Sequence, residues 1–105
     1  MDELRRCTGF QWDDGNSEKN WIAHRVTRAE CEQVFFSRPI VIARTGGQQQ
    51  NESRYYALGR TEMRRWLFIV FTVRDDDVRV ISARDMSRRE RRAYQSAQEE
   101  TDTNI

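Results

Sequence analysis

Hydrophobic and polar positions near the C-terminal end of the chain predict two strands followed by a helix. Residues 67–73 carry no formal charge and are rich in β-branched and aromatic side chains, as in a strand buried on both faces. Three aspartates interrupt this run and residues 78–83 resume it, which predicts an antiparallel hairpin. Ser87 and Glu90 have the spacing of a capping box, so a helix is expected from about Arg88.

The first half of the chain predicts one short strand and two helices. Residues 9–12 form the pattern of a strand, and a helix is expected from there to about His24. Thr27 and Glu30 form a second capping box, which starts the next helix. That helix must end before Pro39, because the residue preceding a proline disfavours helical geometry.

The middle of the chain predicts two further strands. Residues 40–43 and 54–60 are the strands, and residues 44–53 form a polar loop with no packing signal. The predicted fold class is α+β: one antiparallel sheet of four to five strands packed against two N-terminal helices and a C-terminal helix. A single domain is expected over residues 1–95, and the acidic residues 96–105 are expected to form a disordered tail.

Composition narrows the class of protein. The chain has 105 residues, a third of them charged, and a mean hydropathy of −0.92, which suits one small soluble domain. No apolar run approaches the roughly 20 residues that cross a membrane, and residues 1–10 lack the apolar core of a signal peptide, so a cytoplasmic protein is expected. Cys7 and Cys31 form no CxxC motif and the chain has one histidine, so neither a metal nor another cofactor is expected. Cys31 is predicted to be a small buried hydrophobe.

The net charge of +1 conceals an uneven distribution of charge. Residues 54–92 contain eleven arginines and six acidic residues, a local charge of +5. One guanidinium group can bind two oxygens of a phosphate at once, so this half of the chain suggests a phosphate-bearing partner. The alternative is that arginines such as Arg88, Arg89 and Arg92 solvate the exposed face of a helix.

The same half of the chain carries a family resemblance. The run VRVISARDMSRRERRAY resembles the BrnT family, in which R-[IV]-I-S-A-R is followed by E-R-x-x-Y. The matching residues are Arg79, Ile81, Ser82, Ala83, Arg84, Glu90, Arg91 and Tyr94. FQWD near the start and AHRV at the end of the first helix extend the similarity to residues 10–94. The resemblance implies a RelE-like fold.

The resemblance also implies a function and partners. BrnT-like proteins are ribonuclease toxins of type II toxin–antitoxin operons, which implies metal-independent cleavage of mRNA and inhibition of translation. It further implies a BrnA-like ribbon-helix-helix antitoxin, a heterotetramer with that antitoxin, and contact with operator DNA only through the antitoxin. The alternative is a catalytically weak or inactive homologue that binds the antitoxin or nucleic acid.

Metal-independent RNA cleavage needs positive charge at the scissile phosphate and groups that move protons. Arg60, Arg79 and Arg84 are candidates for the charge, because each lies on a predicted strand or at its end. For Arg79 and Arg84 the alternative is an ion pair with Asp85 or Glu90. The candidates for proton transfer are His24, whose ordinary pKa is near neutrality, and Glu52. RNA contacts are expected from Arg54, Arg74, Tyr56, Arg88 and Arg91.

Three positions depart from the family pattern. Relatives usually have Lys-His-Gly at the end of the first helix, where this chain has Ala23, His24 and Arg25. Many relatives have a histidine where this chain has Phe71, and an apolar ring cannot move protons. Either the reaction uses arginines and a carboxylate, or this protein is slow.

Overall fold

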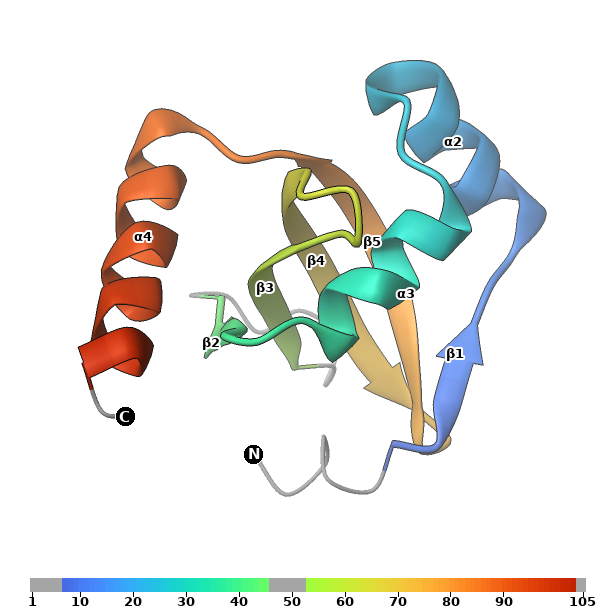
Figure 1. Cartoon of the computed structure of the whole chain (residues 1–105). Coiled ribbons are helices and arrows are strands. Elements are labelled where there is room, and N and C mark those ends of the chain that lie inside the picture. The colour runs from blue at the N-terminus through green and yellow to red at the C-terminus, as the bar shows by residue number, and fades with distance from the viewer. Residues whose placement is uncertain (1–6, 46–52, 104–105) are drawn as a thin grey trace.

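One five-stranded sheet and three helices make up the residues that the computed structural model describes, 7–45 and 53–103 (Figure 1). The strands are β1 (Gly9–Gln11), β2 (Val41–Arg44), β3 (Arg54–Arg60), β4 (Trp66–Arg74) and β5 (Asp77–Asp85). The helices are α2 (Asp14–His24), α3 (Arg28–Phe36) and α4 (Arg88–Thr103). The order of elements and the α+β class are those predicted from the sequence.

The sheet has the strand order β1-β5-β4-β3-β2. Strands β2 to β5 form the predicted antiparallel meander. The predicted antiparallel pairing does not extend to β1, which pairs in parallel with β5, Gly9 opposite Asp77 and Gln11 opposite Arg79. A strand of three residues carries no signal of its direction, so the sequence could not have indicated that the sheet is mixed.

A two-residue turn joins β4 to β5 and confirms the predicted hairpin. Asp75 and Asp76 have φ angles of 53° and 62°. A type I′ turn needs this left-handed conformation at both of its central residues, and aspartate tolerates it better than most residues with a Cβ atom. The run of aspartates therefore marks the turn.

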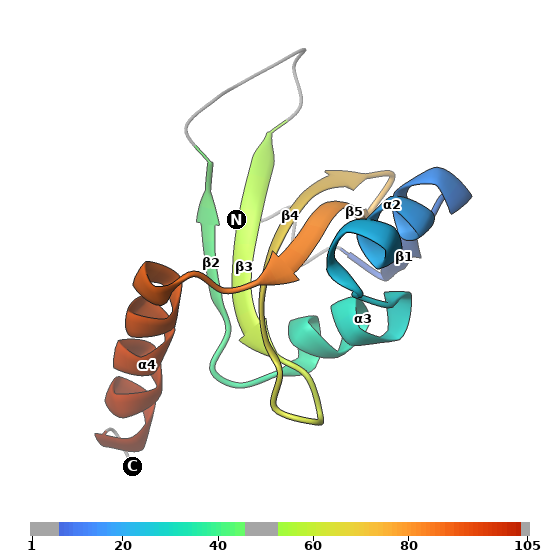
Figure 2. The same ribbon diagram turned by 90° about the horizontal axis from the view of Figure 1, so that it is seen from above.

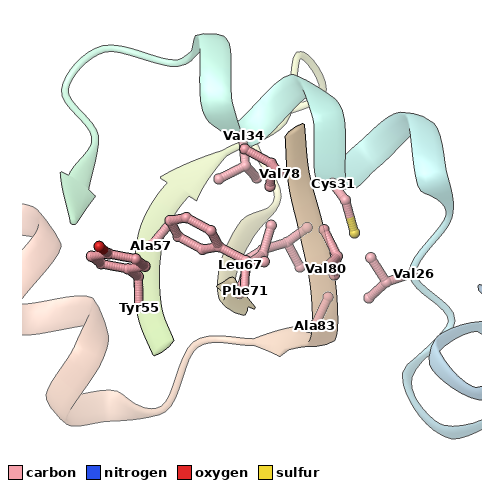
Figure 3. Close-up of a cluster of buried hydrophobic side chains, with 11 residues drawn as sticks. Val26, Cys31, Val34, Tyr55, Ala57, Leu67, Phe71, Val78, Val80 and Ala83 are labelled. Atoms are coloured by element: carbon pink, nitrogen blue, oxygen red, sulfur yellow. The ribbon is translucent and has the colours of Figure 1, made fainter. Parts of the chain in front are cut away.

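Helices α2 and α3 cover one face of the sheet. The main core lies between the sheet and α3, with Val26 from the segment that joins the two helices (Figure 3). Phe71 of β4 is fully buried there, stacked on Tyr55 at 5.4 Å between ring centroids and edge-on to Phe35 at 5.0 Å. Cys31 is buried in the same core, as predicted, and burial raises the pKa of its thiol to about 12. The aromatic contacts fix how α3 lies on the sheet.

The end of α3 approaches β3 closely at Gly59. A Cβ atom at Gly59 would lie 2.6 Å from Ser37 Oγ and 2.7 Å from Val34 Cγ1. The Ser37 hydroxyl donates a hydrogen bond to the Val34 carbonyl at 2.6 Å and accepts one from the Arg60 backbone N–H at 3.3 Å. This contact between helix and strand therefore requires glycine at position 59.

Both predicted capping boxes are present. Thr27 Oγ accepts a hydrogen bond from the Glu30 N–H at 3.1 Å, and the Thr27 N–H donates to Glu30 Oε1 at 3.0 Å. At the start of α4, the Ser87 N–H donates to Glu90 Oε1 at 2.7 Å and Ser87 Oγ accepts from the Glu90 N–H at 3.2 Å. Helices α3 and α4 therefore begin where the sequence predicts.

Helix α4 lies on the other side of the sheet from α2 and α3 (Figure 2). Tyr94 anchors it: the ring is fully buried, meets Trp66 edge-on at 4.9 Å, and its hydroxyl donates to the Pro39 carbonyl at 2.7 Å. Leu58 and Met86 complete this second, smaller core.

The predicted disordered tail is wrong for residues 96–103, which continue α4 to Thr103. Alanine, glutamine and glutamate favour helix, and a helix that is already capped extends at little cost in free energy. Acidic composition alone therefore did not mark the end of the folded chain.

Candidate active site

One face of the sheet carries most of the candidate residues. In β3, Tyr55 and Ala57 belong to the main core, so alternation puts Arg54, Tyr56 and Leu58 on the face turned away from α2 and α3. Part of this face lies under α4. We call the remainder the open face, defined by Arg54, Tyr56, Phe68, Val70, Arg79, Ser82 and Arg84.

A β-bulge turns Arg79 and Arg84 to the same face of the sheet, the open face. Residues five apart in a regular strand point to opposite faces. In β5 the pairing with β4 shifts by one residue at Ile81, so the alternation changes phase there. Val80 before the bulge and Ala83 after it both point into the main core, and Arg79 and Arg84 therefore both point away from it.

Arg84 is held by a carboxylate and an aromatic ring. Its two terminal nitrogens donate to Glu90, Nη1 to Oε1 at 2.8 Å and Nη2 to Oε2 at 3.0 Å. The guanidinium lies over the Phe68 ring, 4.2 Å from its centroid. The hydrogen bonds from Arg84 hold the pKa of the Glu90 carboxyl below its usual range. The Glu90 pair that the sequence left as an alternative is thus present, and it occupies one of the two edges through which the Arg84 guanidinium can bind a phosphate.

Arg79 lies farther along the open face. Its Nη2 donates to Asp13 Oδ2 at 3.2 Å, and the two side chains are 31% and 47% exposed, so water screens the pair strongly. Arg54 lies in the same row across the sheet, because both arginines pair with Thr72 of β4. Their backbones are therefore two strand spacings apart, about 10 Å.

Arg65 is a residue that the sequence analysis missed. It uses all five of its guanidinium hydrogens: two for Asp85, at 2.8 and 3.2 Å, and one for Glu30, at 3.1 Å. The remaining two bind the backbone carbonyls of His24, at 2.9 Å, and Arg25, at 2.7 Å. Arg65 thereby ties the end of α2 and the first turn of α3 to the end of β5. No local spacing distinguishes it from its exposed neighbour Arg64, so nothing in the sequence indicates this role.

His24 is exposed at the end of α2, beside the end of β5. Hydrogen bonds from Arg65 hold the pKa of Asp85 below its usual range, and the charges of Arg91 and His24 add to this effect. Since Asp85 follows Arg84 directly, the structure brings the candidates His24, Arg84 and Arg91 to the same end of β5. Arg79 and Arg54 lie nearer the other end.

Arg60 is separate from this group. It ends β3 beside α3, where its Nη2 donates to the Arg38 carbonyl at 3.1 Å. It borders an open groove of about 640 Å³ whose walls include Phe36 and Arg64. Glu52, the second candidate for proton transfer, lies outside the described residues.

The other predicted RNA-binding residues lie around the open face. Tyr56 stacks on Phe68 with 5.5 Å between ring centroids. Arg74 is exposed at the hairpin end of β4, and Arg88 is exposed in the first turn of α4. The Arg91 guanidinium is 5.8 Å from the centroid of the Trp66 ring.

Residues 7–45 and 53–103 contain neither a group of metal ligands nor a membrane-spanning helix. No three histidine, cysteine, aspartate or glutamate side chains there are grouped so that they could hold a metal ion. No helix in this part of the chain has the length and apolar character needed to cross a membrane.

Comparison with known proteins identifies the family. A family model described as "Ribonuclease toxin, BrnT, of type II toxin-antitoxin system" matches residues 12–90, more than half of the chain. The chain belongs to the BrnT family. The first half of the BrnT-like motif, residues 79–84, forms the part of β5 that contains the bulge.

The structure is also similar to a solved BrnT. The crystal structure of the Brucella abortus ribonuclease toxin BrnT matches with a TM-score of 0.57 and 18% sequence identity, over 77% of this chain and 99% of that chain. At this identity the likeness is one of fold. No curated protein matches the chain.

Two departures from the BrnT pattern lie at the end of α2. Ala23 and Arg25 are both exposed. Arg25 has a φ of 56°, the left-handed conformation that a glycine would adopt more easily, and its guanidinium lies 5.2 Å from the centroid of the Trp21 ring. The helix end therefore keeps a left-handed geometry without the glycine. Trp21 itself is 46% exposed, so it is not a core residue.

The third departure, Phe71, lies on the core side of the sheet. It is fully buried against Tyr55 and Phe35, on the face opposite Arg79 and Arg84. A histidine at position 71 of this BrnT protein would lie in the core. Its replacement by Phe71 therefore does not remove a proton-transfer group from the open face.

Proposed function

We propose that this BrnT protein is a metal-independent endoribonuclease that cleaves mRNA and thereby inhibits translation. The observation that supports the proposal is the presence of Arg79 and Arg84 on one open sheet face, with Arg54 in the same row as Arg79. A sheet aims these guanidinium groups more rigidly than a loop would, and each can bind a phosphate through two nitrogens.

The proposed reaction uses the 2′-hydroxyl of the substrate as the nucleophile. Its oxygen bonds to the adjacent phosphorus while the bond from phosphorus to the next 5′-oxygen breaks. A base takes the 2′ proton and an acid gives a proton to the 5′-oxygen, leaving a 2′,3′-cyclic phosphate and a 5′-hydroxyl. Arg79 and Arg84 are proposed to stabilise the charge that builds on the phosphate, with Arg60 as a third candidate.

His24 is our candidate for proton transfer. Imidazole is the side chain best suited to take up and release a proton near neutral pH, and His24 is exposed beside Asp85 at the Arg84 end of β5. Glu52 is the alternative base. The strand of RNA is proposed to be held by Arg54, Arg74, Tyr56, Arg88 and Arg91, with Tyr56 as a surface on which a base can stack.

A second candidate function is a binding module without catalysis. The observation that favours it is the pairing of both lead arginines with carboxylates, Arg84 with Glu90 and Arg79 with Asp13. Ala23, in place of a lysine, also removes a phosphate contact at the end of α2. In this case the open face would bind RNA or the antitoxin and cut nothing.

Incubation of the purified protein with RNA in EDTA separates the two candidates. The proposed enzyme produces 5′ fragments that end in a 2′,3′-cyclic phosphate or its 3′-phosphate hydrolysis product, and a 2′-deoxy residue at the cut site blocks cleavage. Binding without cleavage supports the second function. Loss of activity in EDTA with recovery in magnesium would rule out the metal-independent mechanism.

Membership of a type II toxin family implies a cognate antitoxin. We propose a BrnA-like ribbon-helix-helix antitoxin that covers the open face in a heterotetramer and alone contacts the operator DNA. Co-expression with the adjacent gene should give a stable complex that neither binds RNA nor inhibits growth. A stable complex that still binds RNA would contradict this mode of neutralisation.

A further inference from the structure

Asn20 is a buried polar residue with no part in the proposed reaction. It lies on α2, is 3% exposed, and its Oδ1 accepts a hydrogen bond from the Ala83 backbone N–H of β5 at 3.1 Å. Its Nδ2 is buried and has no hydrogen-bond partner among the described residues. An unsatisfied buried donor destabilises a fold, so packing alone would favour an apolar residue here. The bond to Ala83 is therefore the feature that calls for an explanation.

This hydrogen bond lies along the part of β5 whose outer edge is not paired with β1. Strand β1 pairs only with residues 77–79, ending at Gln11 opposite Arg79. Beyond that point no strand of the described residues covers this edge of β5. Asn20 supplies to Ala83 the acceptor that a longer β1 would have supplied, so a helix side chain replaces one rung of the ladder.

The register of β5 at Ala83 determines which face of the sheet Arg84 points to. Ala83 lies between the bulge at Ile81 and Arg84. If the bulge relaxed into regular pairing, each side chain after it would turn to the opposite face. Ala83 would leave the main core and Arg84 would leave the open face. A hydrogen bond to the Ala83 N–H opposes that slip directly.

We infer that Asn20 is a positioning residue: through the Ala83 N–H it holds the strand after the bulge in the register that puts Arg84 on the same open face as Arg79. The importance of Arg84 for cleavage rests on the function proposed above. The register itself can be measured without RNA.

Asn20→Leu is the variant that tests the inference, since leucine has a similar volume and no acceptor. The first readout is the Glu90 carboxyl, whose pKa is held low by Arg84. In Asn20→Leu the NMR titration of Glu90 should move up toward its ordinary range, and the Ala83 amide should exchange with solvent much faster. Asn20→Asp keeps an oxygen in place and should restore both readouts. Val26→Ala, a core truncation nearby with no hydrogen bond to β5, is the control for simple loss of stability and should change neither. A Glu90 titration in Asn20→Leu that matches the wild type would overturn the inference.

A double-mutant cycle tests the same link through activity. In single-turnover cleavage of RNA, with all variants shown to be folded by circular dichroism, Asn20→Leu should slow the wild-type reaction by about tenfold or more. It should have little further effect in an Arg84→Ala background, because Asn20 acts through Arg84. Equal losses in both backgrounds would show a general structural role and reject the inference. If the wild type cleaves no RNA, the proposed function fails, while the Glu90 titration still decides the role of Asn20.

Discussion

Arg84 and Glu90 form a two-point ion pair, with both terminal nitrogens of the guanidinium bound to the carboxylate at 2.8 and 3.0 Å. A phosphate that binds end-on to the guanidinium would use the same two nitrogens, so Glu90 competes with RNA for this edge of Arg84. Glu90 also accepts a hydrogen bond from the Ser87 N–H and thereby caps α4. Glutamine can make that cap but carries no charge, so the two roles are separable.

Glu90→Gln should therefore tighten RNA binding. We expect the Kd for single-stranded RNA at low salt to fall by roughly fivefold to tenfold, equivalent to about 1 kcal/mol. Glu100→Gln, an exposed residue farther along α4, removes the same charge and is the matched control. Equal tightening in both variants, measured by fluorescence anisotropy, would mean that only net charge matters.

Arg79→Ala and Arg84→Ala should each slow RNA cleavage by about a hundredfold or more, the loss expected for a preorganised charge donor. RNA binding should change much less than the rate. Lysine at either position should restore part of the activity, because it returns the charge but not the two-nitrogen contact. Arg89→Ala on exposed α4 is the control and should leave the rate nearly unchanged. A loss of binding as large as the loss of rate would argue against the proposed role in the transition state.

Arg65→Ala should destabilise the fold by about 2–4 kcal/mol at neutral pH, because two carboxylates and two carbonyls lose their partner. The lower end is the better estimate, since the Arg65 side chain is 27% exposed and water replaces part of what is lost. Urea melts give the free energy of unfolding, and Arg64→Ala serves as the control from the same turn.

The cost of losing Arg65 should also depend on pH. Burial alone would raise the pKa of Glu30, but hydrogen bonds from Thr27 and Arg65 lower it overall, and Arg65 lowers the pKa of Asp85. A carboxyl with a lowered folded-state pKa contributes stability above its unfolded value, about pH 4, and loses it as pH falls through the folded value. The difference between wild type and Arg65→Ala should thus be largest above about pH 5 and shrink in more acidic solution. A difference that stayed constant from pH 7 to pH 3 would contradict the ion-pair account.

Two glycine-to-alanine substitutions should change the stability of the fold in opposite directions. Gly59→Ala should destabilise the protein by about 1–3 kcal/mol, because the new methyl group would lie within 3 Å of Ser37 and Val34. Gly15→Ala in α2 should stabilise it by roughly 0.5–1 kcal/mol, since the nearest atom to its new Cβ is Asp13 Oδ1 at 3.4 Å. Thermal melts of both variants check the pair. Stabilisation by both would mean that α3 does not approach β3 as described.

The parts of the fold that could be predicted are those whose signals are local. The capping boxes at Thr27 and Ser87 each lie within four residues, and so do the aspartates that turn β4 into β5. The parallel pairing of β1 joins residues nearly seventy positions apart, Gly9 with Asp77, and three residues are too few to show a direction. The continuation of α4 past residue 95 depends on helix propensity, which an acidic composition does not indicate.

The candidate site was predictable to a similar extent. The family run pointed to Arg79 and Arg84, but counting along a regular strand would have put them on opposite faces, and the bulge at Ile81 became visible only in the sheet. The five contacts of Arg65 come from four distant residues, which no spacing could indicate. The family pattern marks Phe71 as a lost proton-transfer position, whereas its contacts with Tyr55 and Phe35 place it in the core.

The bulge also limits how the length of β5 can change. Removing or adding one residue within residues 78–84 would exchange the two faces of the strand from that point onward. Arg84 would then point into the main core and Ala83 onto the open face. A change of two residues would restore the original facing. Insertions and deletions that leave a working protein are therefore expected in β5 only in pairs, while the turn at Asp75 and Asp76 and the loops can vary one residue at a time.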